Sequence, residues 1–320
     1  MIVKERKMPV HLLQLEALLR RLPAHHPKKN VVAENLAKFM AGYKGEQAIE
    51  YPLSFLSETK YSILHDIRLF DQKHYFQIDT IIVSSYFLLF LEIKNIVGTL
   101  IFDAKFNQLI RISDGALEEG FPDPLLQVKR QEMQLKKWLS LHGLYNFPIE
   151  SLVVISSPRT IIKTSDEILF SKIIHSANIP NRIKQIENQY KEKMIDNING
   201  LIDQIMNEHS PQRQNVLAQY NIKKEELLKG VQCEKCFIMT MLKEKKGWRC
   251  SNCNGMSKYA HLRALQDYTL LFGMITTNSE LRDFLNMQSS SAVKRLLQTM
   301  DIPYIGENKG RIYDLTHLQL

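Results

Sequence analysis

The sequence predicts an α/β protein in which a mixed β-sheet carries helices on its sides and two smaller modules follow. Two apolar runs within residues 77–95, separated by Ser84, Ser85 and Tyr86, are typical of a hairpin of two buried strands. All four cysteines fall within residues 233–253, and two capped helical patterns and two short β-patterns lie between residues 277 and 313. A chain of 320 residues has room for two or three such domains.

The composition is that of an ordinary soluble protein, with 44% hydrophobic and 24% charged residues. The formal net charge of +8 favours polyanionic partners. The N-terminus lacks the apolar core of a signal peptide, and no run of 18 apolar residues occurs. We therefore expect a cytoplasmic protein without membrane association, and the sequence leaves formation of a homo-oligomer open.

The N-terminal elements are expected to be helical. Leucines at helical spacing predict a helix over residues 10–22, and a second helical pattern covers residues 31–56 with a break near Pro52. Glu46 lies in this second helix. Residues 61–69 then read as a strand that leads through a turn at residues 71–73 into the hairpin.

The elements after the hairpin continue the α/β pattern. Residues 99–102 and 108–112 predict strands, and residues 113–123 predict a loop. Asp123 as N-cap and Pro124 in the first turn predict a helix to about residue 141. Residues 151–156 predict a short buried strand that closes the sheet, and residues 165–230 read as a mostly helical connector.

Three charges, Asp79, Glu92 and Lys94, interrupt the apolar hairpin, and a buried charge needs a partner. If Ser85 and Tyr86 form a two-residue turn, Asp79 lies opposite Glu92, and Lys94 shares the face of Glu92. Two carboxylates that close repel each other unless a cation lies between them, which favours a divalent ion with oxygen ligands. A longer turn would shift this register, and a surface salt bridge of Lys94 is the structural alternative.

An Asp followed about a dozen residues later by Glu-x-Lys resembles the PD-(D/E)xK nuclease superfamily, and the surroundings resemble its nuclease-related domain (NERD) family. The matching stretches occur in the family's order and cover roughly residues 40–160: Gly45-Glu46, Gln77-Ile78-Asp79, Leu91-Glu92-Ile93-Lys94-Asn95 with Gly98, and Asp123-Pro124-Leu125-Leu126-Gln127. The sequence departs from the family at Thr80, where many members have His, and at Ser84-Ser85, where many have Gly.

The resemblance implies a restriction-endonuclease-like fold and a deoxyribonuclease, with endonuclease action expected, that uses Mg²⁺ or Mn²⁺. It implies that Asp79, Glu92 and the carbonyl of Ile93 hold the catalytic ion. Lys94 would orient the attacking water or stabilise charge on the phosphate. Glu46 would support the metal or position water, and Gln127 would contact a phosphate or the water.

The cysteines form two Cys-x2-Cys pairs, Cys233 with Cys236 and Cys250 with Cys253, separated by thirteen residues. This spacing is typical of a zinc ribbon, and four thiolate ligands make a closed, structural Zn²⁺ site. The clustering argues against disulfides. The surrounding Lys and Arg residues suit a phosphate backbone, although ribbons also bind proteins.

The C-terminal segment is expected to form a winged helix. Thr277 and Glu280 have the form of a capping box, a second capped helix begins near Ser289, and two short β-patterns flank residues 306–310. The residues expected to meet DNA are Ser290, Ser291, Lys294, Arg295, Lys309 and Arg311. A helical interaction domain without a DNA role is the alternative for this segment.

These patterns divide the chain into five parts: an N-terminal helix (1–30), a nuclease domain (31–165), a helical connector (166–230), a zinc ribbon (231–258) and a winged-helix-like module (259–320). The predicted function is metal-dependent hydrolysis of DNA phosphodiester bonds, with the ribbon and the winged helix positioning DNA. The alternative functions are a DNA-binding regulatory protein with a catalytically silent nuclease fold, and an adaptor that recruits proteins through the ribbon.

Overall fold

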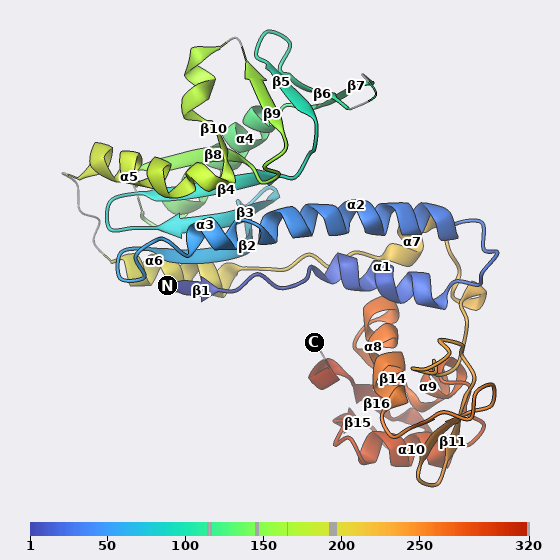
Figure 1. Ribbon diagram of the computed structural model, residues 1–320. Helices are drawn as coiled ribbons and strands as arrows, with labels where there is room; N and C mark the ends of the chain where they lie inside the picture. The colour runs from blue at the N-terminus through green and yellow to red at the C-terminus, as the bar shows by residue number, and fades with distance from the viewer. Residues whose placement is uncertain (114, 116, 145–146, 165, 192–196, 319–320) are drawn as a thin grey trace. The chain divides into compact units, whose positions relative to one another are not determined.

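The computed structural model describes residues 1–113, 115, 117–144, 147–164, 166–191 and 197–318 (Figure 1). The chain forms two compact units, each assembled from segments that are distant in sequence. Unit 1 contains Met1–Met8 and Phe39–Gln212, and unit 2 contains Pro9–Lys38 and Arg213–Leu320. Among the residues that the structure describes, no helix combines the length and the apolar character that crossing a bilayer requires.

Unit 1 is built on a six-stranded mixed sheet, which confirms the predicted fold class. Its strands are, in spatial order, β1 (Ile2–Lys4), β2 (Ser62–Phe70), β3 (Tyr75–Val83), β4 (Leu88–Lys94), β8 (Ile149–Ile155) and β10 (Ile173–His175). The pairs β2–β3 and β3–β4 are antiparallel, whereas β1–β2, β4–β8 and β8–β10 are parallel. A second sheet of unit 1 has the order β7 (Glu118–Pro122), β6 (Gln108–Ile112), β5 (Thr99–Asp103) and β9 (Ile161–Thr164).

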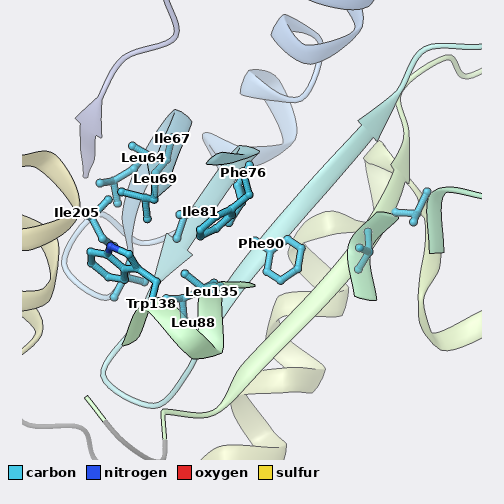
Figure 2. Packing of buried hydrophobic residues seen from close by; sticks show 14 of the residues in the cluster. Leu64, Ile67, Leu69, Phe76, Ile81, Leu88, Phe90, Leu135, Trp138 and Ile205 are labelled. Carbon is cyan, nitrogen blue, oxygen red and sulfur yellow. The ribbon is translucent and has the colours of Figure 1, made fainter. Parts of the chain in front are cut away.

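Helices cover both faces of the six-stranded sheet. They are the C-terminal part of α2 (Lys29–Gln47), α3 (Glu50–Leu53), α4 (Pro124–Leu141), α5 (Ile179–Tyr190) and α6 (Ile198–Glu208), with short 3₁₀ turns η1 (Glu167–Ser171) and η2 (Ser176–Asn178). One apolar core joins the sheet to α4 and α6, and Figure 2 shows Trp138 and Leu135 of α4 and Ile205 of α6 in it. A second core joins the opposite face to α3 and α5. The sheet is therefore the middle layer of three.

The hairpin has the register expected for a two-residue turn. Thr80 pairs with Leu91 and Val83 with Leu88, and the Ser84 amide donates to the Phe87 carbonyl at 3.0 Å. The α4 helix also begins as predicted, because the Asp123 carboxylate accepts from the Leu125 amide at 2.9 Å.

Three details of unit 1 differ from the sequence expectation. Residues 118–122 form the edge strand β7, not a loop; their exposed glutamates give no apolar alternation to reveal it. The strand at 151–156 does not close the sheet, because β10 pairs beyond it. Strand β10 lies within residues 165–230, where we expected mainly helices, and its three residues are too few to show a sequence pattern.

Unit 2 contains helices, a four-cysteine module and two small sheets. Its elements are α1 (Val10–Arg21), the N-terminal part of α2, α7 (Val216–Tyr220), η3 (Lys224–Glu226), β11 (Met241–Glu244), β12 (Gly247–Cys250), β13 (Met256–Ser257), α8 (Ala260–Phe272), β14 (Ile275–Thr277), α9 (Asn278–Phe284), α10 (Ser290–Gln298), β15 (Tyr304–Ile305), η4 (Asn308–Gly310), β16 (Ile312–Asp314) and η5 (Thr316–Leu318). The sheets have the orders β11-β12-β13 and β14-β16-β15. The capping box of Thr277 and Glu280 and the N-cap at Ser289 are present as predicted.

A buried ion pair ties α1 to α8 within unit 2. The fully buried Arg21 donates to Asp267 at 2.8 Å and to the Gly230 carbonyl at 2.7 Å, and its guanidinium carbon lies 4.3 Å from the centroid of the Phe284 ring. Arg20 donates to the other carboxylate oxygen of Asp267 at 2.7 Å.

Replacing Arg21 with methionine is expected to lower the free energy of unfolding of unit 2 by about 3 kcal/mol, because the buried Asp267 carboxylate loses its fully buried partner and the Gly230 carbonyl loses its donor. The matched variant Arg20→Met removes a partly exposed guanidinium and should cost about 1 kcal/mol. Urea unfolding followed by circular dichroism measures both. Equal losses in the two variants would show that burial of the guanidinium does not decide the cost.

Candidate active site

A close approach of α2 to the end of β4 positions Glu46. A Cβ atom at Gly45 would lie 2.2 Å from the Cβ of Asn95 and 2.8 Å from Oγ of Ser156, so only glycine fits there. The Asn95 side-chain amide donates to the Ala41 carbonyl at 2.7 Å and fastens the helix in place. The Gly45-Glu46 pair therefore sets both the approach of the helix and the position of the carboxylate.

Strands β3 and β4 bring Asp79, Glu92 and Lys94 together. Oδ2 of Asp79 accepts from the Ile93 amide at 2.8 Å. Nζ of Lys94 lies 2.6 Å from Oε1 of Glu92, and Glu92 is almost completely buried. The Lys94–Glu92 ion pair is thus an internal part of the hairpin.

Helix α4 supplies two amide side chains to the same place. Oε1 of Gln127 accepts from Nζ of Lys94 at 3.1 Å. One turn later, Nε2 of Gln131 donates to Oε2 of Glu92 at 2.9 Å and to the Gln77 carbonyl at 2.9 Å. Gln131 was not predicted, although its place four residues after Gln127, on the same helix face, was a usable signal.

Glu46 has two further neighbours that the sequence did not point to. Nη1 of Arg6 lies 2.5 Å from Oε2 of Glu46 and 3.0 Å from Oδ1 of Asp66. Arg6 is separated from Glu46 by forty residues of chain, and no local motif marks it.

Burial and mutual repulsion of these acidic groups perturb their proton affinities. The pKa of Asp79 is raised well above its usual range, first because burial removes its carboxylate from water and then because Glu92 and Glu46 are near. Burial also raises the pKa of Glu46 to about 7, with Asp66 and Glu92 adding to the rise and Arg6 opposing it. Without a bound cation, burial and the neighbouring carboxylates therefore favour the protonated forms of Asp79 and Glu46.

The donor atoms fit a divalent cation such as Mg²⁺ or Mn²⁺. Carboxylate and carbonyl oxygens are the ligands that these ions prefer, and a nearby cation would lower the raised pKa values. Oε1 of the buried Gln131 has no hydrogen-bond partner within the described part of the chain, so the site still has an unused acceptor. Asp79, Glu92 and the carbonyl of Ile93 would hold the ion, with Glu46 beside them.

We expect the stability of unit 1 to fall as the pH rises from about 4.5 to about 7 when no divalent cation is bound. A carboxyl group with a raised folded-state pKa stabilises the fold below its unfolded pKa, and this contribution is lost as the pH rises through the folded value. Glu46 alone can contribute up to about 3 kcal/mol. Melting temperatures at pH 5 to 8, in buffer without Mg²⁺ or Mn²⁺, measure the effect.

Protons and Mn²⁺ compete for the same carboxylate oxygens. The rise in melting temperature on adding Mn²⁺ should therefore grow as the pH increases, which opposes the fall in stability seen without the cation. A melting temperature that rises steadily from pH 5 to 8 without the cation would contradict the assignment. Chelators are left out of this experiment, since they would also remove ions from the cysteine site.

The four cysteines of unit 2 converge as a second candidate metal site. Their sulfur atoms all lie within 4.8 Å of one another, and the pairs Cys233–Cys253 and Cys236–Cys250 are 3.6 Å apart. Among the residues described, they are the one group of three or more Cys, His, Asp or Glu side chains placed to share an ion. A hydrogen bond from Thr240 lowers the pKa of the Cys250 thiol to about 6, which favours the thiolate that a metal needs.

The residues predicted to meet DNA lie near α10 and the β15–β16 pair. Ser290, Ser291, Lys294 and Arg295 are exposed, and Oγ of Ser290 donates to Asn278 at 2.9 Å. The Arg311 guanidinium carbon lies 4.3 Å from the Tyr304 ring centroid. The side chain of Lys309 lies outside the described residues. A DNA-binding role for this set stays a prediction.

Comparison with known proteins bears on unit 1. Residues 41–156 match the family model described as nuclease-related domain. No curated protein and no solved structure matches the chain. The matched range contains Gly45, Glu46, both strands of the hairpin and the whole of α4, and it ends one residue after β8. Residues 41–156 of this chain are therefore similar to the nuclease-related domain family.

Proposed function

We propose that unit 1 hydrolyses DNA phosphodiester bonds in a reaction that depends on Mg²⁺ or Mn²⁺. One observation carries the proposal: Asp79, Glu92, Lys94 and Gln127 meet at one end of the hairpin, with the carboxylate of Glu46 close enough to perturb its neighbours. Buried charges of this kind are costly in a protein core, which favours a catalytic role over a structural one.

When bound, the divalent ion polarises the scissile phosphate and makes a water molecule more acidic. Asp79 and Glu92 would hold the ion through their carboxylate oxygens, and the Ile93 amide and the Gln131 side-chain amide fix the orientation of these carboxylates. Lys94, which lies between Glu92 and Gln127, presents its ammonium group to the phosphate or to the attacking water. Gln127 orients Lys94, and Glu46 accepts a proton from water or aligns it.

Unit 2 would hold the DNA. The exposed Lys294 and Arg295 on α10 supply positive charge, and Ser290 and Ser291 lie at the helix start where side chains meet base edges in helix-turn-helix proteins. The four-cysteine module would bind structural Zn²⁺ and present further basic residues to the phosphate backbone.

The test incubates the purified protein with supercoiled plasmid and with linear DNA, with Mg²⁺, with Mn²⁺ or with neither, beside a Lys94→Ala variant. Nicking or linearisation of the plasmid that requires both the metal and Lys94 is expected, and it would establish an endonuclease. Loss of linear DNA alone would indicate digestion from the ends. Cleavage that persists in Lys94→Ala, or cleavage of RNA only, would contradict the proposal.

The second candidate is a DNA-binding protein whose nuclease fold is silent. It is favoured by two contacts: both oxygens of Glu92 already have partners, Lys94 and Gln131, within the chain. Tight, salt-sensitive DNA binding without cleavage over several metals is the result that supports it.

A further inference from the structure

Arg6 is a buried cation near the candidate active site, and both of its terminal nitrogens have hydrogen-bond partners. Its side chain is fully buried, and Nη1 bridges Glu46 and Asp66 at 2.5 and 3.0 Å. It comes from the segment Met1–Met8, which belongs to unit 1 although it lies outside the family match at residues 41–156. The guanidinium thus joins the N-terminus of the chain to the carboxylate that α2 presents to the site.

The second terminal nitrogen of the same guanidinium, Nη2, contacts strand β3 at Asp79 and Thr80. Nη2 of Arg6 donates to the Asp79 carbonyl at 3.1 Å and to Oγ1 of Thr80 at 2.9 Å, and it lies 3.0 Å from Nδ1 of His65. Burial and the neighbouring cations lower the pKa of His65 to about 3, so its ring is neutral and Nδ1 can accept this hydrogen bond. Arg6 therefore contacts both the backbone of Asp79 and the side chain of Glu46.

Arg6 fills an interruption in the β2–β3 ladder. His65 pairs with Thr80 and Ile67 with Ile78, but the pair between them, Asp66 and Asp79, is not formed. Asp66 has a φ of 51°, in the left-handed region that non-glycine residues rarely adopt.

The side-chain alternation of both strands changes at this interruption. Leu64 of β2 and, beyond the break, Ile67 lie in the core under α4, and so do Ile78 of β3 and, beyond its break, Ile81. Each pair is three residues apart, where regular alternation requires an even number. Backbone irregularities of this kind are concentrated at functional sites, and here the guanidinium donates to the Asp79 carbonyl, which has no ladder partner at Asp66.

We propose that Arg6 is a positioning residue of the active site, which acts by holding the Glu46 carboxylate and the Asp79 backbone in the geometry that receives the divalent ion. The inference rests on the proposed function, because it assigns a role within the same site. When no divalent ion is bound, the charge of Arg6 keeps the Glu46 carboxylate beside Asp79 and Glu92. Residues 1–8 are therefore part of the catalytic domain, and a domain cut at residue 41 would lack this support.

The alternative is a purely structural role, in which Arg6 only attaches the N-terminal segment to β2. Lys4 provides the matched control, because its Nζ donates to the backbone carbonyls of His65 at 2.6 Å and Asp66 at 3.2 Å without touching a carboxylate of the site. If fastening were the whole role, Arg6→Met and Lys4→Met would have similar consequences.

The experiment uses the full chain and two readouts, plasmid-cleavage kinetics and the Mn²⁺ dissociation constant from calorimetry without DNA. Arg6→Met is expected to lower kcat about 100-fold with KM within about threefold, and to weaken Mn²⁺ binding about 10-fold, as for residues that orient metal ligands. Lys4→Met should stay within about threefold of wild type in both. In a Glu46→Gln background, Arg6→Met should lower kcat by a clearly smaller factor than it does in the wild-type chain.

If Arg6→Met does not fold, Arg6→Lys is used instead. This variant keeps the positive charge but cannot donate from two nitrogens to Glu46 and Asp79 at once. It should fold and still lose about 10-fold in kcat. Equal Mn²⁺ constants for wild type and the Arg6 variants, or equal effects of the Arg6 and Lys4 variants, would overturn the inference. A wild-type protein that binds Mn²⁺ but cuts nothing would contradict the proposed function alone, because the Mn²⁺ constants still decide the role of Arg6.

Discussion

An Asp79→Asn variant is expected to lose at least about 10³-fold in the rate of DNA cleavage and, without a divalent cation, to melt at a higher temperature than wild type. The rate falls because the loss of one metal ligand removes several kcal/mol of transition-state stabilisation, at 1.36 kcal/mol for each factor of ten. The melting temperature rises because the variant no longer has a carboxylate that burial, Glu92 and Glu46 all disfavour.

The geometry of the variant supports a gain in stability. The asparagine can still accept the hydrogen bond from the Ile93 amide, so the change mainly removes charge. For a unit of this size, each kcal/mol gained raises the melting temperature by about 2–4 °C. Calorimetric melting at pH 8 in buffer free of Mg²⁺ and Mn²⁺ measures it, and added Mn²⁺ should stabilise wild type more than the variant.

Asp71→Asn is the matched control in the same unit, with the opposite expectation. Burial alone would raise the pKa of Asp71, but hydrogen bonds from the His74 amide, Gln134 and the Lys73 amide outweigh it and hold this pKa well below its usual range. The control should therefore melt at a lower temperature and keep its cleavage rate. If Asp79→Asn also melted lower, its carboxylate would be structural, and the catalytic assignment would lose its electrostatic basis.

The register of the hairpin was predictable because it depends on neighbouring residues. Two apolar runs and a short turn leave few ways to pair, because the length of the turn fixes the register of a hairpin. The position of Asp79 opposite Glu92 follows from that register, and Lys94 follows from alternation. The cysteine cluster was predictable for a similar reason, since two Cys-x2-Cys turns bring their sulfurs to one point.

Arg6 and Asp66 could not be predicted because their roles depend on packing between segments distant in sequence. The short strand β1 adds to β2 as a parallel edge, which no local pattern of three residues can show. The left-handed backbone at Asp66 is likewise a tertiary effect, since nothing in the sequence around it calls for a turn. The edge strand β7 was missed because its exposed residues lack the alternation that reveals buried strands.

Removal of the metal proposed for the cysteine site is expected to unfold the core of unit 2, beyond the four-cysteine module itself. Cys233, Cys250 and Trp248 belong to the same apolar cluster as residues of α9 and α10, including Phe284 and Val293. Structural zinc in small modules contributes about 10–16 kcal/mol of apparent binding free energy, which equals or exceeds the whole stability of an ordinary domain. The cluster should therefore not survive loss of the ion.

The two tryptophans of the chain allow the test to be read in one unit at a time, because Trp138 lies in unit 1 and Trp248 in unit 2. In a Trp138→Phe background, Cys250→Ser should shift the emission of Trp248 to longer wavelength, since this ring is buried and its Nε1 donates to His261 at 3.1 Å. Hydrogen exchange should rise in α8–α10 and remain low in β3 and β4.

Ser251→Ala is the matched control for Cys250→Ser, since Ser251 is the exposed neighbour of a cysteine and only donates to the Thr240 carbonyl at 3.2 Å. It should keep both the emission and one zinc ion per chain by elemental analysis. A protein that contains no metal and still protects α8–α10 would show that the four thiols pack as ordinary core side chains. In that case the apolar cluster that contains Trp248 and Phe284 would hold unit 2 together, and the four-cysteine module would need no ion to fold.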